Sequence, residues 1–151
     1  MKRRGLARNV GVSNFGTRLL EPAIALCPEI ILNQFEYHPY LNQRILLEAV
    51  RRFGLAITAY CPIALGKVVG DPAIEAIASR HNKTAAQVTL RWLVQQGDVI
   101  AIPRTSKVER LRENLAVFDF ELSRDEMQAM SRLTRPNSRL INEPAWVPVW
   151  D

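Results

Sequence analysis

The feature that most constrains the fold is a repeated alternation between short apolar runs and stretches with helical spacing. The runs are rich in β-forming residues and predict strands at residues 9–12, 30–36, 55–60 and 99–102. They are apolar throughout rather than alternating, which is typical of parallel strands covered by helices. Strand-to-helix alternation predicts right-handed crossovers. The sequence therefore predicts an α/β fold with a parallel sheet.

Start and stop signals place helices between the strands. Helical spacing predicts one helix over residues 17–26, and Asn42 can cap a second that runs to about Phe53 and ends at Gly54. Asp71 followed by Pro72 is a strong start for a third. Three capping boxes predict further starts: Thr84 with Gln87, Ser106 with Glu109, and Ser123 with Glu126. The regular pattern stops after Leu133.

Length and composition exclude several classes. The 151 residues are 48% hydrophobic, which suits one soluble domain, yet no apolar run approaches the roughly 20 residues of a membrane span. No secretory signal is expected, and Cys27 and Cys61 form no C-x-x-C pair, so a cytoplasmic location is expected. A complete (β/α)8 barrel needs about 250 residues, so the chain is too short for one.

Other nucleotide and metal motifs are missing. The sequence has no G-x-G-x-x-G and no P-loop, which argues against Rossmann and P-loop binding. His38 and His81 lack metal-ligand spacing, so surface or structural roles are expected. The net charge of +5 comes from basic residues scattered without aromatic interleaving, so nucleic-acid binding is not expected.

Polar and aromatic residues follow each predicted strand. They are Ser13 and Asn14, residues 33–38, Tyr60, and Arg104 to Ser106. Because ligands bind at the carboxyl ends of parallel strands, four such ends favour one site, although each alone is also ordinary turn chemistry. Tyr60 can stack on a flat ring or be a core aromatic. Cys61 is interpreted as a small packing residue.

The fourth strand end is the most basic. Its cations, Arg104, Lys107, Arg110 and Arg112, crowd a predicted helix start, where they oppose the helix dipole. A bound phosphate would reverse that cost, held by arginine forks and the hydroxyls of Thr105 and Ser106. The alternative is a solvated basic face that Glu109 and Glu113 partly neutralise.

Motifs at these strand ends resemble the aldo/keto reductase family. Residues 11–15 resemble its fifth-strand motif, residues 33–40 its sixth, residues 58–62 with Gly66 and Lys67 its seventh, and residues 102–114 its eighth with the NADP-binding helix. Residues 118–123 and 146–151 also match. The resemblance implies the C-terminal half of a TIM (β/α)8 barrel over residues 1–134, with four β/α units, followed by a tail at residues 135–151.

The resemblance also implies an activity, the NADPH-dependent reduction of aldehydes or ketones, and contacts along the whole cofactor. At the nicotinamide end these are Ser13, Asn14 and Gln34 with the carboxamide, and Tyr60 stacked on the ring. Pro62, Leu65 and Lys67 pass over the pyrophosphate. Arg104, Thr105 and Arg110 hold the 2′-phosphate, beside Ser106, and Glu113 and Asn114 contact adenine. Trp146 can line the substrate pocket or pack against the body.

Two residues depart from the family pattern: Cys61 replaces a serine, and Arg104 replaces the commoner lysine, which keeps a phosphate contact. The family's catalytic Asp, Tyr, Lys and His lie on its first four strands, so no catalytic residue is assigned here. Tyr37, His38 and Tyr40 belong to the sixth-strand motif instead.

Three hypotheses follow for this chain. It is a truncated product with little activity, a half barrel that associates through its open strand edges with itself or an N-terminal half, or a non-catalytic NADP-binding or interaction module. A flavodoxin-like sheet is the structural alternative.

Overall fold

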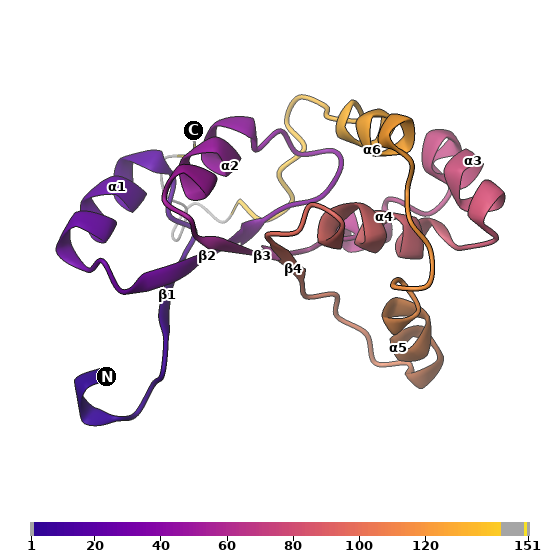
Figure 1. The fold of residues 1–151 in the computed structure, drawn as a ribbon. Helices are drawn as coiled ribbons and strands as arrows, with labels where there is room; N and C mark the ends of the chain where they lie inside the picture. The colour runs from indigo at the N-terminus through magenta and orange to yellow at the C-terminus, as the bar shows by residue number, and fades with distance from the viewer. Residues whose placement is uncertain (1, 143–149, 151) are drawn as a thin grey trace.

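A computed structural model describes residues 2–142 and 150 of the chain. Its sheet has four parallel strands, β1 (Val10–Ser13), β2 (Ile30–Glu36), β3 (Ala56–Tyr60) and β4 (Val99–Ala101) (Figure 1). All four lie where the sequence predicts strands. The predicted α/β fold with a parallel sheet is therefore confirmed.

The strand order is β1-β2-β3-β4, so each strand pairs with the next one along the chain. A flavodoxin-like sheet has the order 2-1-3-4-5 and does not keep this succession. The flavodoxin-like alternative is therefore wrong. Sequential parallel pairing is the order found in the wall of a β/α barrel.

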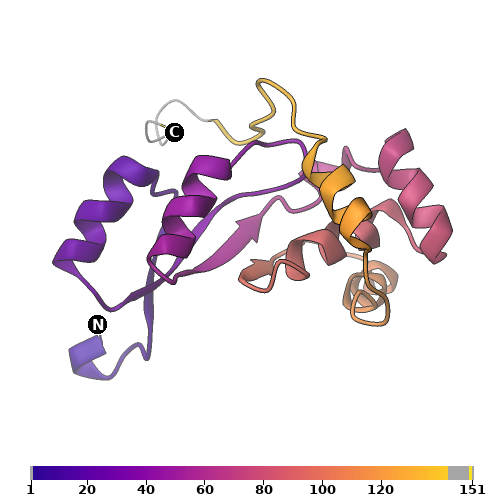
Figure 2. The ribbon, with the colours of Figure 1, turned by 45° about the horizontal axis from the view of Figure 1, so that its top comes forward.

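Six α-helices accompany these strands in the described part of the chain. They are α1 (Thr17–Leu26), α2 (Arg44–Arg52), α3 (Pro72–His81), α4 (Ala85–Val94), α5 (Val108–Leu115) and α6 (Arg124–Ser131). Short 3-10 turns lie at Lys2–Arg4 and Ala64–Gly66. Helices α1 and α2 lie on one face of the sheet (Figure 2), and α4 contacts β4. None of the helices described in residues 2–142 could cross a membrane.

The hydrophobic core fills the space between this helical layer and the sheet. Phe35, Ile57 and Leu46 are fully or almost fully buried there. On the opposite face of the sheet, Gly11 and Ser13 are exposed, and Ile100 is 52% exposed. The apolar strands predict a sheet covered by helices, but only one face is covered within the described residues.

Three predicted helix starts form as the sequence indicates. The Asp71 carboxylate accepts hydrogen bonds from the backbone N–H groups of Ala73 and Ile74 at the start of α3. The Thr84 and Ser123 capping boxes are complete at the starts of α4 and α6. Gly54 has a positive φ of 65° just after α2, which fits its predicted role as a helix stop.

One predicted cap is wrong and another is shifted by one residue. Helix α5 begins at Val108, and its cap position is Lys107, whose backbone is extended and whose side chain makes no capping bond. The helix therefore starts too late for Ser106 and Glu109 to form a box. Helix α2 begins at Arg44 with Gln43 at the cap position, one residue later than predicted, but the Asn42 Oδ1 accepts the backbone N–H of Arg44 over 3.1 Å. Gln43 donates to the main-chain oxygen of Glu36.

The tail has no helix or strand over residues 135–142, as the sequence predicts. Its first residue is held firmly, because the Arg135 N–H donates to the Tyr40 carbonyl over 2.9 Å and the guanidinium lies 2.7 Å from the Asp71 carboxylate. Trp146 lies outside the described residues, so its expected place at the substrate pocket stays a prediction.

Candidate cofactor site

Two adjoining cavities open at the carboxyl ends of β3 and β4. The first has a volume of about 700 Å³ and the second about 590 Å³. They share lining residues from the segments that follow both strands: Ile63, Gly66, Arg104, Thr105 and Arg110. The carboxyl end of a parallel sheet is where α/β folds bind ligands.

Tyr60, the last residue of β3, lines the first cavity with its half-buried side chain. Its hydroxyl donates to the Asn14 Oδ1 over 3.0 Å, which ties the end of β3 to the segment after β1. Burial raises the pKa of the Tyr60 hydroxyl, and the Glu36 carboxylate raises it further. The hydroxyl is thus satisfied as in a core tyrosine, while the side chain remains on a cavity wall.

The loop after β3 has an unusual backbone. Cys61, Ala64 and Leu65 have φ values of 49°, 48° and 54°, a left-handed region that costs L-residues about 1–2 kcal/mol each. Pro62 and Leu65 line the first cavity. Cys61 lines it too with a half-buried side chain, and its role as a small packing residue stays a prediction. Burial raises the pKa of the Cys61 thiol, which therefore stays protonated at neutral pH.

Arg104, Thr105 and Arg110 line both cavities, and Ser106 and Lys107 line the first. Within the described part of the chain, neither the Arg104 nor the Arg110 guanidinium has an ion-pair or hydrogen-bond partner. The carboxylate of Glu113 accepts a hydrogen bond from the Thr84 hydroxyl rather than pairing with a cation. Glu113 therefore does not neutralise these arginines, which are free to meet either an anion or solvent.

Glu113 and Asn114 line the second cavity from α5. Helix α4 sets the position of α5, because the Gln87 Nε2 donates to the carbonyls of Glu113 and Ala116, each over 3.1 Å. The opposite wall of this cavity comes from the junction of α3 and α4, at residues 83–86, together with Glu75 and Val69. Sequence reasoning missed this wall, since only its capping signal at Thr84 was visible.

Four predicted contact residues line neither cavity. Ser13 pairs in register with Gln34, and Gln34 pairs with Thr58, so both lie on the same sheet face as Tyr60 but nearer β1. Asn14 reaches the site only through its bond to Tyr60. Lys67 lines a separate cavity of about 230 Å³ beside Tyr40 and the tail.

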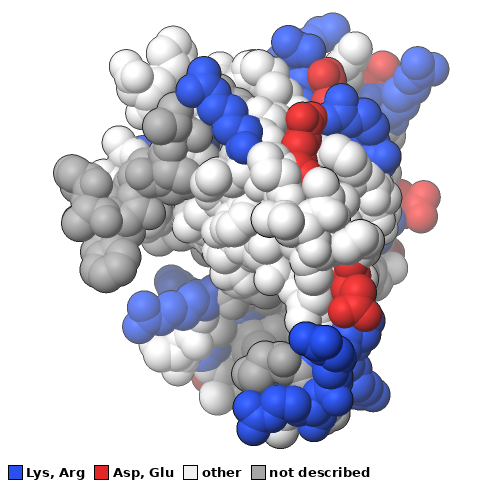
Figure 3. Space-filling view, turned by 90° about the vertical axis from the view of Figure 1, so that its left-hand side faces the viewer, with Lys and Arg blue, Asp and Glu red and all other residues white. Residues whose placement is uncertain are grey.

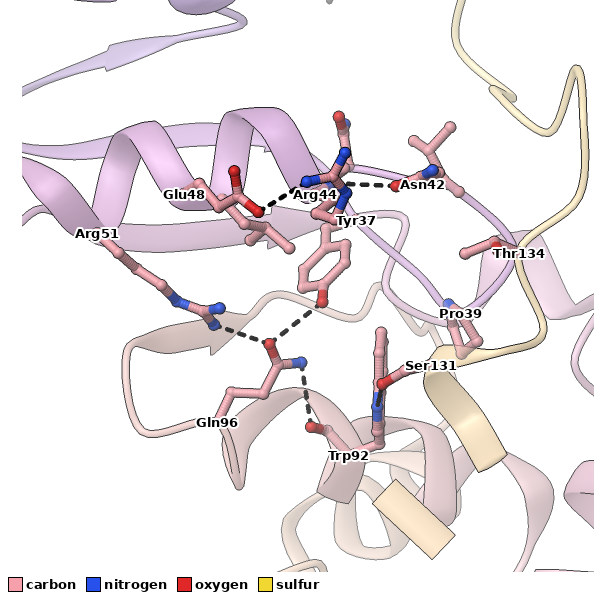
Figure 4. Close-up of a pocket in the computed structure, with 13 residues that line it drawn as sticks. Tyr37, Pro39, Asn42, Arg44, Glu48, Arg51, Trp92, Gln96, Ser131 and Thr134 are labelled. Atoms are coloured by element: carbon pink, nitrogen blue, oxygen red, sulfur yellow. Dashed lines mark hydrogen bonds and ion pairs between the residues drawn. The ribbon is translucent and has the colours of Figure 1, made fainter. Parts of the chain in front are cut away.

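A further cavity of about 430 Å³ lies between α2 and α4 (Figure 4). Its charged groups are satisfied: Arg44 pairs with Glu48, and Arg51 binds Asp98 and Gln96. Tyr37 donates to the same Gln96 Oε1 over 3.1 Å. This groove between two helices offers no unpaired charge to a ligand.

The two histidines are structural, which was one of their two predicted roles. The His38 Nε2 lies 3.0 Å from the Glu36 Oε1, and the His81 Nε2 lies 2.9 Å from the Glu126 Oε2. Burial raises the pKa of Glu126, but bonds from His81, Ser123 and Arg80 outweigh it and lower the value to about 2. The described residues contain no group of three or more metal-binding side chains.

Comparison with known proteins shows the family to which the chain belongs. The model of the aldo/keto reductase family matches residues 1–135. An aldo-keto reductase of Mycolicibacterium smegmatis is 43% identical over 148 residues, which cover 96% of this chain and 51% of that protein. Methylglyoxal reductase DkgB of Escherichia coli O157:H7 is 38% identical over 99% of this chain and 56% of its own length.

Solved structures of full-length relatives share the fold. A crystal structure of a variant of Gox0644 in complex with NADPH matches with a TM-score of 0.90 and 36% identity over 97% of this chain and 54% of its own. The Bombyx mori aldo-keto reductase in complex with NADP matches with a TM-score of 0.87 and 30% identity. The match covers 96% of this chain and 50% of that one. The chain spans about half the length of the relatives that it matches.

Proposed function

Since the chain belongs to the aldo/keto reductase family, we propose that it forms most of the NADP(H) site of an enzyme that reduces aldehydes or ketones with NADPH. In this proposal its four strands are the fifth to eighth of a TIM barrel, in residues 1–134, and residues 135–151 are the tail. The observation that carries the proposal is the pair of unpaired arginines where two cavities meet.

The order of residues along the two cavities fits an extended dinucleotide. Tyr60 lines only the first cavity, Glu113 and Asn114 line only the second, and the arginines are common to both. The residues proposed to stack on the nicotinamide, bind the phosphates and contact adenine would therefore lie in the same order as these groups do along NADP(H). Ser13, Asn14 and Gln34 are proposed for the carboxamide, beyond Tyr60.

Each part of the site has a task that its chemistry suits. When bound, NADPH supplies the hydride. Arg104 and Arg110 neutralise the 2′-phosphate with charge-assisted bonds, and the hydroxyls of Thr105 and Ser106 donate to it. The loop with Pro62, Leu65 and Lys67 covers the pyrophosphate, where the Cys61 thiol is a weaker donor than a serine hydroxyl. We propose no catalytic residue in this chain.

Titration of the purified chain with NADPH tests the proposal. We expect a saturable signal in calorimetry and in tryptophan fluorescence, with NADPH bound more tightly than NADH because only NADPH offers a 2′-phosphate to the arginines. Absence of binding at millimolar NADPH would contradict the proposed cofactor site.

The chain is also proposed to self-associate. Strands β1 and β4 each pair on one side only, and Ile100 and Ile102 are exposed on the uncovered sheet face. The side that carries α1 presents a wide uncharged surface with Lys and Arg side chains above and below it (Figure 3). Unpaired strand edges and exposed apolar surface favour association.

Light scattering across a concentration series measures this association. We expect a mass above the 17.1 kDa of one chain that rises with concentration. Ile100→Lys should reduce the association, whereas Phe118→Lys, at a residue 71% exposed outside the sheet, should not. A constant mass of one chain at every concentration would refute the prediction.

A further inference from the structure

Glu36 is a buried carboxylate at the end of β2, with none of its surface exposed. Its two oxygens accept backbone N–H groups from the tail: Leu140 donates to Oε1 over 2.7 Å and Ile141 to Oε2 over 2.9 Å. The His38 Nε2 lies 3.0 Å from the same Oε1. The carboxylate thus joins the sheet to a segment more than 100 residues later.

These bonds keep the buried group charged. Burial raises the pKa of Glu36, but the bonds from His38, Leu140 and Ile141 outweigh it and hold the pKa below its usual value. A buried charge without such partners would be costly. The backbone N–H groups of the tail therefore help to stabilise the buried charge of Glu36. The carboxylate in turn holds the tail main chain in place.

The bonds to Glu36 lie beyond the first attachment of the tail. The tail is attached at Arg135, through Tyr40 and Asp71, and next by its main chain at Leu140 and Ile141. Between them, the Ser138 hydroxyl bonds only to the Arg135 carbonyl. Loss of the Glu36 bonds would leave residues 140 and 141 without these two main-chain anchors.

Ile141 lines the same cavity as Tyr60. Glu36 is also the register partner of Tyr60 across β2 and β3. The carboxylate therefore lies beside one wall of the cavity, Tyr60, and bonds to the main chain of another, Ile141, without lining the cavity itself.

We propose that Glu36 is a positioning residue for the cofactor site: it holds the tail main chain at Leu140 and Ile141, so that Ile141 closes the cavity beside Tyr60. The proposal rests on the proposed cofactor function. It assigns Glu36 no contact with NADPH, only control of the wall against which the nicotinamide end would lie.

Glu36→Gln tests this assignment, because glutamine keeps the size and one acceptor oxygen but loses the second acceptor. Backbone amide exchange should rise about 10-fold or more at residues 140 and 141, while the strands stay protected. NADPH affinity should fall about 3- to 10-fold with the preference over NADH unchanged, since the arginines are untouched.

Gln43→Met is the matched control. It removes the bond from Gln43 to the main-chain oxygen of Glu36, at a residue only 7% exposed, and leaves the carboxylate intact. It should lower stability without loosening residues 140 and 141. Equal tail exchange in both variants, or unchanged exchange in Glu36→Gln, would overturn the proposal.

A second variant, Glu36→Asp, tests the proposal in case Glu36→Gln does not fold. Glu36→Asp keeps the charge but is one methylene shorter, so it should loosen the tail and weaken NADPH in the same direction; native-like tail protection and affinity would overturn the proposal. If the unmodified chain binds no NADPH, the proposed function fails. The exchange experiment then still decides whether Glu36 fixes the tail.

Discussion

Replacing Arg110 with alanine is expected to weaken NADPH binding about 10- to 100-fold, and NADH binding far less. A hydrogen bond to a charged group contributes about 1.5–3 kcal/mol, which corresponds to this range of affinity. Arg110 lines both cavities and its guanidinium has no partner among the described residues, so it is available to a phosphate. Arg104→Ala should behave in the same way.

Calorimetric titration with both cofactors measures the effect. The matched control is Arg112→Ala, because Arg112 lies on the same helix, carries the same charge and lines neither cavity. It should change NADPH affinity less than about 3-fold, as expected for an exposed charge at a distance. Equal losses for NADPH and NADH in Arg110→Ala would refute the assignment to the 2′-phosphate.

Asp71→Ala is expected to lower the free energy of unfolding by about 2–4 kcal/mol, the largest stability effect we predict. One oxygen of this buried carboxylate caps α3, and the other accepts from the Tyr40 hydroxyl over 2.9 Å and from Arg135 over 2.7 Å. Its removal leaves a helix uncapped, takes the shorter of two hydrogen bonds from the Tyr40 hydroxyl and leaves the Arg135 guanidinium without its carboxylate partner. Urea denaturation at neutral pH measures the loss.

Asp71→Asn separates charge from hydrogen bonding, and we expect a loss of about 1–2 kcal/mol because the amide oxygen still caps the helix. Burial raises the pKa of Asp71, but bonds from Tyr40, Ile74, Ala73 and Arg135 outweigh it and hold the pKa below 3.8. Its charge therefore stabilises the fold above that pH and less as the pH falls.

The difference between the native chain and Asp71→Asn should accordingly narrow below about pH 4. Asp125→Ala is the control, since Asp125 is an exposed carboxylate in the first turn of α6. Its loss should cost less than about 1 kcal/mol. A loss in Asp71→Ala no larger than that of the control would contradict the role given to Asp71.

The predicted caps show which signals are local. Asp71, Thr84 and Ser123 act on backbone groups two or three residues away, so their neighbours decide the outcome and the predictions are confirmed. The Ser106 capping box does not form, although Ser106 and Glu109 are the same residue types as Ser123 and Glu126. Helix α5 begins only at Val108: the Lys107 N–H bonds to the Thr105 hydroxyl, and Gln87 of α4 holds the far end of the helix at Glu113.

The candidate site likewise has one part that shows in the sequence and another that depends on contacts between distant residues. Arg104 to Ser106 and Arg110 are close in the sequence, so the basic strand end was visible as a cluster; its role in binding NADP(H) stays a prediction. The residues opposite, Lys83 to Ala86 and Ile141, carry no such signal. They reach the cavities only because α3, α4 and the tail pack around the ends of the strands.

By itself, the sequence determined the α/β class, the four strands, most helix starts and the basic strand end, since period and capping act over a few residues. Only the tertiary structure decided the strand order, the meeting of two cavities at Arg104 and Arg110, and the bonds from Glu36 to Leu140 and Ile141. These depend on contacts between residues tens of positions apart, which form when the whole chain has packed.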